Sequence, residues 1–428
     1  MLEGAGKTVF SNKRLLDPET IIGTERIVGR DEQLEDTVRL FRPFLHDESA
    51  NDMMFYGPSG TGKSLIVEHV ASETVSIAEE QGVDFEVFTL NCNSAKTADD
   101  AFYRFGKIVG KEVNAEYEIK KQGISTSEKI EYLFDLISDH YDAVLFVLDE
   151  VDQLINTSRQ EYAYSDVIYQ LSRTTELGLE DTDVSVATIS NNPTFMENLG
   201  SRAFSSYHPS KVHFPDYNAP QLEEILENRK DAFKSGVVGD GVLSLCAALA
   251  ARDHGDARQA IDLLRHAGEM ANNNGESVVT EDHVYQAEEI EQRNVLHEQI
   301  SGLSSTKQQA LYAVAACCTY TPDSVEKVPG PLVYSVFNHI LQTIGDRSVS
   351  RASYFRYMNE LETYMIVKSE RKSFGQGSRV KLYQLPEHAD TTMDELHNNA
   401  DLHILKDRQD ELRRVVENLA EQSDVIQI

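Results

Sequence analysis

The residues with the most specific chemistry lie in one short stretch, Gly57-Pro58-Ser59-Gly60-Thr61-Gly62-Lys63-Ser64. This stretch matches the phosphate-loop pattern G-x-x-x-x-G-K-[ST] at every fixed position. Its glycines allow the backbone to curl so that successive N–H groups face a phosphate. Lys63 would reach the outer phosphates of a nucleotide, and the Ser64 hydroxyl would bind Mg²⁺. The stretch therefore predicts a site for ATP or ADP with Mg²⁺.

The sequence on either side of this loop fits the same interpretation. Residues 53–56 are apolar and predict a short strand, and residues 65–70 predict a helix. The N-terminus of that helix adds partial positive charge beside the phosphates. A chance glycine turn is the alternative, and it would not need this strand and helix. The predicted phosphate-binding residues are Gly57, Pro58, Ser59, Gly60, Thr61, Gly62, Lys63, Ser64 and Leu65.

Two carboxylates, Asp149 and Glu150, follow an unbroken apolar run over residues 143–148. Such a run predicts a strand that is buried on both faces of a parallel sheet. Ligand sites form at the carboxyl ends of these strands. We expect Asp149 to hold Mg²⁺ through water and Glu150 to orient and deprotonate the attacking water. The alternative is an acidic helix cap that follows a core strand.

Three further side chains could complete this site. Asn191, with Asn192 as its alternative, ends a strand predicted from residue 184 and could hydrogen-bond the outer phosphate or the attacking water. Arg202 lies in the next loop, where it could reach the nucleotide of a neighbouring subunit; in a monomer it would be an exposed loop residue. Asp256 is a suitable N-cap, which places Arg258 in the first turn of a helix. Arg258 would then face the cleft or form a structural ion pair.

The chain has 428 residues and four cysteines. We expect about two to four domains, because this length exceeds one ordinary core. No apolar run approaches the ~20 residues of a membrane span, and no signal peptide opens the chain. We therefore expect a cytoplasmic, nucleoid-associated protein with no membrane partner. The cysteines lack metal spacing and predict buried thiols in a reducing compartment.

The formal net charge of −31 argues against nucleic acid if it is taken alone, because phosphates attract Lys and Arg. The acidic residues are, however, spread along the whole chain rather than gathered in one tail. This spread favours a surface adapted to concentrated salt, as in proteins of salt-loving organisms. The places where basic residues persist are then informative.

Hydrophobic periodicity and breaks predict the order of the domains. Residues 1–20 are polar and expected to be loose, and residues 21–216 suit an α/β nucleotide-binding base. Residues 217–300 suit an all-α lid. The lid helices are predicted over residues 221–233, 242–253, 256–272 and 281–298.

The pattern of predicted elements differs from that of the lid over residues 301–385. It predicts three helices and a hairpin, which is the pattern of a winged helix. Residues 386–428 are an acidic tail, with an amphipathic helix predicted over 394–420. The winged-helix elements are predicted as helices over 305–319, 331–344 and 350–363 and as strands over 364–367 and 380–385.

The winged-helix region carries a local excess of positive charge. Residues 345–383 contain eight basic and four acidic residues, a balance of +4. We expect Phe355, Met358 and Leu361 to form the inner face of the third helix. Duplex DNA is the favoured partner, and a protein-binding winged helix is the alternative. The predicted DNA contacts are Arg351, Ser353 and Arg356 on that helix and Arg371, Lys372, Arg379 and Lys381 beside the hairpin turn.

A second basic surface is predicted within the base. Residues 94–121 suggest an inserted helix on which Arg104, Lys107 and Lys111 share one face. These residues form either a solvated helix face or a surface that contacts nucleic acid.

Together these features resemble one family, the archaeal origin-recognition replication initiators, which are related to eukaryotic origin-recognition and cell-division-control proteins. The resemblance covers nearly all of residues 20–385 and implies an AAA+ P-loop ATPase core, a small helical lid and a C-terminal winged helix. It is carried by Ile27-Val28-Gly29-Arg30, residues 57–64, Asp149-Glu150, Phe214-Pro215-Asp216-Tyr217 and residues 255–265.

The same resemblance implies individual roles. Asn191 would be the first sensor, Arg202 the arginine finger and Arg258 the second sensor. Tyr217 and Arg229 would contact the nucleotide, and the inserted helix would touch DNA. The apolar pair Ile27 and Val28 would make an apolar contact with the adenine base.

The resemblance implies an ATP-dependent DNA replication initiator that binds double-stranded origin DNA and helps to recruit the replicative helicase. ATP binding and slow hydrolysis would act as a switch, and other initiator paralogues are possible partners. The alternative is a signalling-type AAA+ switch whose winged helix binds protein. A clamp-loader-like ATPase is disfavoured, because such proteins normally lack a winged helix.

Overall fold

The computed structural model describes residues 8–17, 27–46, 49–155, 162–173, 182–192, 194–253, 255–321, 327–373, 379–386, 389–398 and 401–422. The chain divides into two compact units, residues 1–287 and 288–428. Among the described residues, no helix has the length and apolarity needed to cross a membrane.

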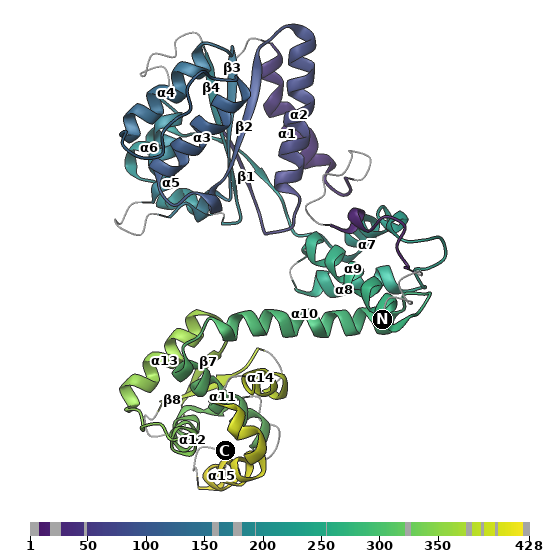
Figure 1. Cartoon of the computed structure of the whole chain (residues 1–428), viewed down its shortest axis with the longest axis vertical. Coiled ribbons are helices and arrows are strands. Elements are labelled where there is room, and N and C mark those ends of the chain that lie inside the picture. Colours follow the sequence, from purple (N-terminus) through teal and green to yellow (C-terminus); the bar gives the residue numbers. More distant parts are fainter. Residues whose placement is uncertain are drawn as a thin grey trace. The chain divides into compact units, whose positions relative to one another are not determined.

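The first unit is built on a parallel sheet of five strands in the order β2-β3-β4-β1-β5 (Figure 1). This topology confirms the predicted α/β base. The positions of β1, β3 and β4 match the predicted ones closely, whereas β5 was not predicted. The strands are β1 (Met53–Tyr56), β2 (Phe85–Asn91), β3 (Ala143–Asp149), β4 (Asp183–Ser190) and β5 (Ser210–His213).

The central strand β3 is buried on both faces, as its unbroken apolar run predicts. Val144, Phe146 and Leu148 pack into the core on one side of the sheet. The alternate residues, Leu145 and Val147, pack into the core on the other side. Because side chains alternate across a strand, both faces need cover from helices.

Helices cover both faces of this sheet (Figure 1). On one side lie α1 (Asp31–Phe41) and α2 (Lys63–Gln81), whose apolar residues share a core with β1 and β5. On the other side lie α3 (Ala98–Glu112), α4 (Thr126–Ser138), α5 (Ala163–Leu171) and α6 (Ser201–Ser206). The inserted helix expected over residues 94–121 is shorter than predicted, and α4 and α5 were not predicted.

The lid follows β5 in the same unit. Its helices are α7 (Ala219–Glu227), α8 (Val242–Asp253), α9 (Ala257–Asn274) and α10 (Glu281–Ser301), and α10 continues into the second unit. Asp256 caps α9, as expected, because its carboxylate accepts hydrogen bonds from the backbone of Arg258 and Gln259.

Residues 8–17 correct the prediction of a loose N-terminus, because they pack against the lid. The backbone N–H of Val9 donates to Asn272 on α9, at 2.8 Å. Phe10 forms an antiparallel bridge with Phe233, and their rings lie 5.0 Å apart. Leu16, in a short 3-10 helix (Lys13–Leu16), is fully buried in the lid core.

The second unit contains the predicted winged helix. Its first three helices are α11 (Ser305–Tyr320), α12 (Gly330–Thr343) and α13 (Arg351–Thr363), close to their predicted positions. A short strand and a hairpin form an antiparallel sheet in the order β6-β8-β7. These strands are β6 (Val328–Pro329), β7 (Lys368–Ser373) and β8 (Arg379–Gln384).

Two details of the second unit differ from prediction. Tyr354, rather than Phe355, joins Met358 and Leu361 on the buried face of α13, and Phe355 is 37% exposed. Positions 354, 358 and 361 follow helical spacing better than the predicted set. The first hairpin strand begins at Lys368 because residues 364–367 form the turn after α13, with Met365 at φ 57°.

The predicted acidic tail is not a separate element. α14 (Ala389–Leu396) and α15 (Gln409–Glu421) pack on α11 and contribute to the winged-helix core. Leu412 and Val416 of α15 are buried there together with Met393 of α14. The tail therefore completes the core of the second unit in the part of it that the structure describes.

Candidate functional site

A cavity of about 640 Å³ lies in the first unit, between the base and the lid. Almost all of the predicted nucleotide-site residues line it. They are Ile27, Val28, Ser59, Gly60, Thr61, Gly62, Lys63, Ser64, Leu65, Asp149, Glu150, Asn191, Tyr217, Arg229 and Arg258. Gly57, Pro58 and Arg202 do not line it.

The phosphate loop runs from β1 into α2 and is held in shape by contacts that only glycine permits. Gly57 has φ 149°, and a Cβ atom there would lie 2.0 Å from the Phe214 carbonyl oxygen. Gly60 has φ 65°, and a Cβ atom there would lie 1.6 Å from the Asp256 carboxylate. The loop therefore lies in contact with both the chain that leads into the lid and the start of α9.

Lys63 is buried at the start of α2. Its Nζ donates to the carbonyls of Gly57 and Pro58 at 2.8 and 2.5 Å and to Oδ1 of Asn191 at 2.8 Å. Burial lowers the pKa of Lys63 to about 8, and the nearby Arg258 acts in the same direction. The ammonium is thus placed among acceptors at the phosphate end of the cavity, where an anion would stabilise its charge.

We expect nucleotide affinity to fall as the pH rises from about 7 to about 9.5. The lowered pKa, about 8, means that the nucleotide-free protein loses the Lys63 proton within this range. Phosphate binding favours the charged form, so each unit above the pKa costs up to tenfold in affinity. Titration calorimetry with ADP at several pH values across this range measures the affinity and tests the prediction. The Lys63→Arg variant, which stays charged, should show a flat profile; an equally steep fall in that variant would contradict the assignment.

Ser64 and Asp149 lie side by side where a metal ion is expected. The Ser64 hydroxyl donates to the two carboxylate oxygens of Asp149 at 3.2 and 3.0 Å. Burial raises the pKa of Asp149, and the Ser64 hydrogen bond opposes this shift. One hydroxyl and one carboxylate are the hard oxygen ligands that Mg²⁺ uses together with phosphates and water. These residues therefore fit the ion that the phosphate loop implies.

Glu150 follows β3 in a left-handed conformation, with φ 53°. Its carboxylate accepts a hydrogen bond of 2.5 Å from the side-chain amide of Asn93. Asn93 lies just after β2, which pairs with β3 up to Asn91 and Asp149. Asn93 was not predicted, because only the sheet topology brings residue 93 next to residue 150.

The structure distinguishes the two asparagines after β4. Asn191 lines the cavity and accepts from Lys63, whereas Asn192 uses its Oδ1 to accept from the Thr194 backbone and hydroxyl. Arg202 is exposed on α6, and its guanidinium lies 5.2 Å from the Tyr169 ring centre. Arg202 does not reach the cavity of its own chain, so any contact with nucleotide would involve another copy.

Arg30 is a residue of the nucleotide cavity for which no role was predicted from the sequence. It is 2% exposed and lines the cavity. Its guanidinium donates to the carbonyls of Thr61 at 2.9 Å and Pro215 at 2.6 Å, and it lies 3.6 Å from the ring centre of Tyr217. Arg30 therefore connects the phosphate loop with the segment that leads into the lid.

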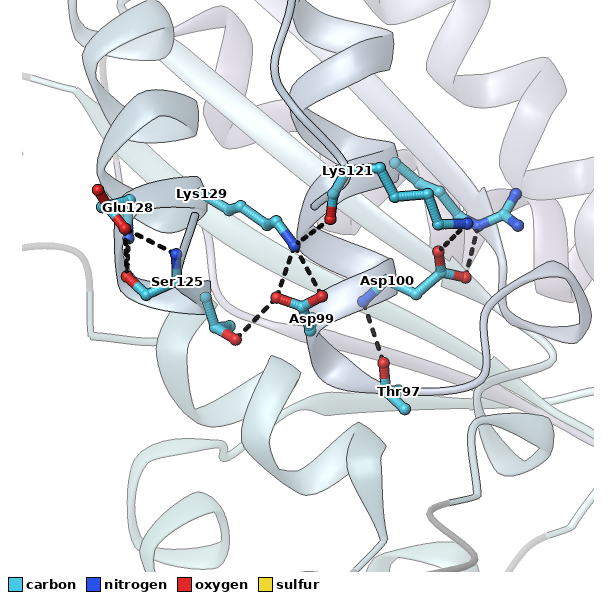
Figure 2. Close-up of polar contacts among 9 residues, drawn as sticks. Thr97, Asp99, Asp100, Lys121, Ser125, Glu128 and Lys129 are labelled. Carbon is cyan, nitrogen blue, oxygen red and sulfur yellow. Dashed lines mark hydrogen bonds and ion pairs between the residues drawn. The ribbon is translucent and has the colours of Figure 1, made fainter. Parts of the chain in front are cut away.

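The basic residues predicted on α3 differ in their surroundings. Arg104 donates to Asp100 at 3.1 Å, and the same carboxylate is paired with Lys121 at 3.1 Å. The neighbouring Asp99 holds Lys129, which is 1% exposed, at 2.7 Å (Figure 2). This network fixes α4 and the preceding loop against the start of α3.

Lys107 and Lys111, by contrast, are exposed on α3. The charge of Arg104, unlike theirs, is partly compensated, because Arg104 is paired with Asp100 at the start of the helix. Of the three residues predicted on this face, Lys107 and Lys111 are the most accessible to an external anion.

In the second unit, five of the predicted DNA contacts are exposed: Arg351, Arg356, Arg371, Lys372 and Arg379. Ser353 belongs to the N-terminal cap of α13, where its backbone N–H donates to Ser350. Lys381 is different, because its ammonium pairs with Glu362 at 2.6 Å and donates to Asn359 at 3.2 Å. Its charge is largely compensated by α13.

Family models match three consecutive parts of the chain. The model described as ATPase family associated with various cellular activities (AAA) matches residues 53–207. The Cdc6 AAA+ ATPase-type lid domain matches residues 223–289, and the CDC6 C-terminal winged helix domain matches residues 298–395.

Relatives in salt-loving archaea resemble the chain over most of its length. ORC1-type DNA replication protein 5 of Halobacterium salinarum is 42% identical over 371 residues, 86% of this chain and 87% of that protein. ORC1-type DNA replication protein 14 of Haloarcula marismortui is 38% identical over 423 residues, 97% of this chain and 98% of that protein. Of the solved structures, the Aeropyrum pernix ORC1 protein in complex with DNA gives a TM-score of 0.73 at 28% identity and covers 93% of this chain and 99% of that chain. These matches, with the fold and the cavity, confirm the resemblance: the chain belongs to the ORC1-type DNA replication proteins, AAA+ ATPases with a Cdc6-type lid and a C-terminal winged helix.

Proposed function

We propose that the protein is a replication initiator that binds duplex origin DNA and whose DNA binding and helicase recruitment depend on the bound nucleotide. One observation carries the DNA part of the proposal: five exposed arginines and lysines persist on α13 and the hairpin in a chain of net charge −31. In so acidic a protein, an exposed basic surface points to an anionic partner. The Aeropyrum pernix relative, solved in complex with DNA, supports duplex DNA as that partner.

The arrangement of the first unit supports a switch rather than rapid turnover. Lys63, Ser64 and Asp149 would bind phosphate and Mg²⁺, and Arg30 connects the phosphate loop to the segment that leads into the lid. Asn93 holds the carboxylate of Glu150, the residue proposed to activate water. Hydrolysis would be slow as long as this hydrogen bond restrains Glu150. ATP and ADP would thus define two long-lived states of the lid.

We expect Arg356→Ala and Arg371→Ala each to weaken duplex binding across sequences and to reduce the slope of log K against log salt by about 1. Each arginine is exposed and would neutralise one phosphate. Fluorescence anisotropy with origin-like and random duplexes, from moderate to molar salt and with ATP or ADP, measures both quantities. Arg414→Ala, an exposed arginine on α15, is the matched control and should change neither.

A second candidate function is a signalling-type AAA+ switch whose winged helix binds protein. Apolar side chains on the same domain favour it: Phe355 is 37%, Tyr364 55% and Met365 78% exposed. The anisotropy experiment separates the two functions. Absence of sequence-selective duplex binding under every nucleotide and salt condition would rule out the initiator and leave this alternative.

A further inference from the structure

The described N-terminal residues, 8–17, form a strap that is anchored on the lid and reaches the nucleotide cavity. Backbone N–H groups of Ser11 and Asn12 donate to the Ala232 carbonyl at 2.8 and 3.0 Å. Lys13 pairs with Glu269 of α9 at 2.7 Å. The last residue of the strap, Asp17, lines the cavity. The strap therefore presents one carboxylate to a site whose other acidic residues come from the base and from α9.

Helix α9 indicates which part of a nucleotide Asp17 would face. The helix starts at the phosphate loop, where the Ala257 N–H donates to the Gly60 carbonyl at 3.2 Å. Its cavity-lining residues then continue from Arg258 through Ile261 and Asp262 to Arg265. At a rise of ~1.5 Å per residue, Arg265 lies about 10 Å along the axis from Arg258.

The strap contacts α9 at its far end. Lys13 meets Glu269, one turn beyond Arg265, and Asp17 follows Lys13 after the single 3-10 turn that ends at Leu16. Asp17 is therefore placed near the third turn of α9 rather than at the phosphate end. Three apolar residues of the cavity, Val28, Ile225 and Ile261, belong to the same lid core as Leu16. This is the end of the cavity that suits a base and its sugar.

The chemistry of a carboxylate agrees with this placement. An ionised carboxylate only accepts hydrogen bonds, and phosphate oxygens offer it no donor. The donors of an adenine nucleotide are the exocyclic amine of the base and the hydroxyls of the ribose.

We propose that Asp17 selects the nucleoside by accepting a hydrogen bond from the base amine or from the 2′-hydroxyl of the ribose. Because the strap packs on the lid, Asp17 makes this contact as a part of the lid. This inference rests on the proposed nucleotide switch and names a specificity residue within it. Because the strap is bound to α9, a nucleotide held by Asp17 is also held by the lid helix that carries Arg258.

The test measures dissociation constants of the full chain for ADP, IDP and 2′-deoxy-ADP by calorimetry. IDP replaces the base amine by a carbonyl, and 2′-deoxy-ADP lacks one ribose hydroxyl. A charge-assisted hydrogen bond predicts that the wild type prefers ADP to one of the two analogues by about tenfold or more. Asp17→Ala should reduce that preference to about twofold or less, and Asp17→Asn, which keeps an acceptor, should retain an intermediate preference.

The control variant Asp240→Ala removes an exposed carboxylate of the lid that lies outside the cavity. It should leave the preference for ADP over IDP and over 2′-deoxy-ADP unchanged. If Asp17→Ala loses only the preference for ADP over IDP, Asp17 contacts the base. If it loses only the preference for ADP over 2′-deoxy-ADP, Asp17 contacts the sugar. If Asp17→Ala changes the affinity for all three ligands by the same factor, the inference is wrong although the nucleotide switch stands. If the wild type binds none of the three, the proposed function fails as well.

Discussion

Replacing Glu150 by glutamine is expected to lower the rate of ATP hydrolysis by about 10² to 10⁴-fold while ATP affinity stays within a few-fold of the wild type. The loss corresponds to the removal of a general base. Affinity is retained because phosphate and Mg²⁺ are assigned to Lys63, Ser64 and Asp149. Single-turnover hydrolysis and ATP titration measure the two effects separately. A Glu150→Gln protein that hydrolyses ATP at the wild-type rate would remove Glu150 from the mechanism.

Asn93→Ala is the informative partner of this variant, because it should act in the opposite direction. The Asn93 amide holds the Glu150 carboxylate at 2.5 Å, and its removal frees that carboxylate to orient water. We expect the hydrolysis rate to rise severalfold, and the double variant to be as slow as Glu150→Gln alone. A double variant faster than Glu150→Gln would show that Asn93 affects hydrolysis through another group.

The parts of this protein that were predictable from sequence are those where one segment determines both the structure and the chemistry. The phosphate loop is contiguous, and its strand and helix are its immediate neighbours. The run over residues 143–148 is apolar at every position, and a strand buried on both faces demands this. Asp149 and Asn191 were located as the ends of such strands. The local sequence pattern was therefore enough to predict the position of the phosphate loop, of this strand and of these two site residues.

The residues that were missed depend on contacts between distant segments. Asn93 reaches Glu150 only because β2 pairs with β3. Asp17 reaches the cavity because the strap packs on a helix more than 200 residues later, as the bond from Val9 to Asn272 shows. The error on α13 is of a different kind. Tyr354 and Phe355 are both aromatic, so composition does not decide which of them is buried, and the helical spacing to Met358 and Leu361, which favours Tyr354, was the signal that could have decided it.

Arg30→Ala is expected to lower the free energy of unfolding of the first unit by about 2–4 kcal/mol. The guanidinium makes charge-assisted hydrogen bonds to the carbonyls of Thr61 and Pro215, each worth about 1.5–3 kcal/mol. Burial opposes part of this gain, and it also lowers the pKa of Arg30. The variant leaves two carbonyls without their donor and removes the cation from the Tyr217 face. Calorimetry should show the melting temperature falling by about 5–15 °C.

Two further variants distinguish this role from a general loss of charge. Arg39→Ala removes an arginine from α1 whose side chain is 72% exposed, so its stability should stay within about 0.5 kcal/mol of the wild type. Arg30→Lys keeps the charge but lacks the planar fork that reaches both carbonyls, so it should recover less than half of the loss. Nucleotide affinity should fall along with stability in Arg30→Ala, because Thr61 belongs to the phosphate loop and Pro215 leads into the lid. Wild-type melting and affinity in Arg30→Ala would show that other contacts, such as those at Gly57 and Gly60, connect the phosphate loop with the lid without Arg30.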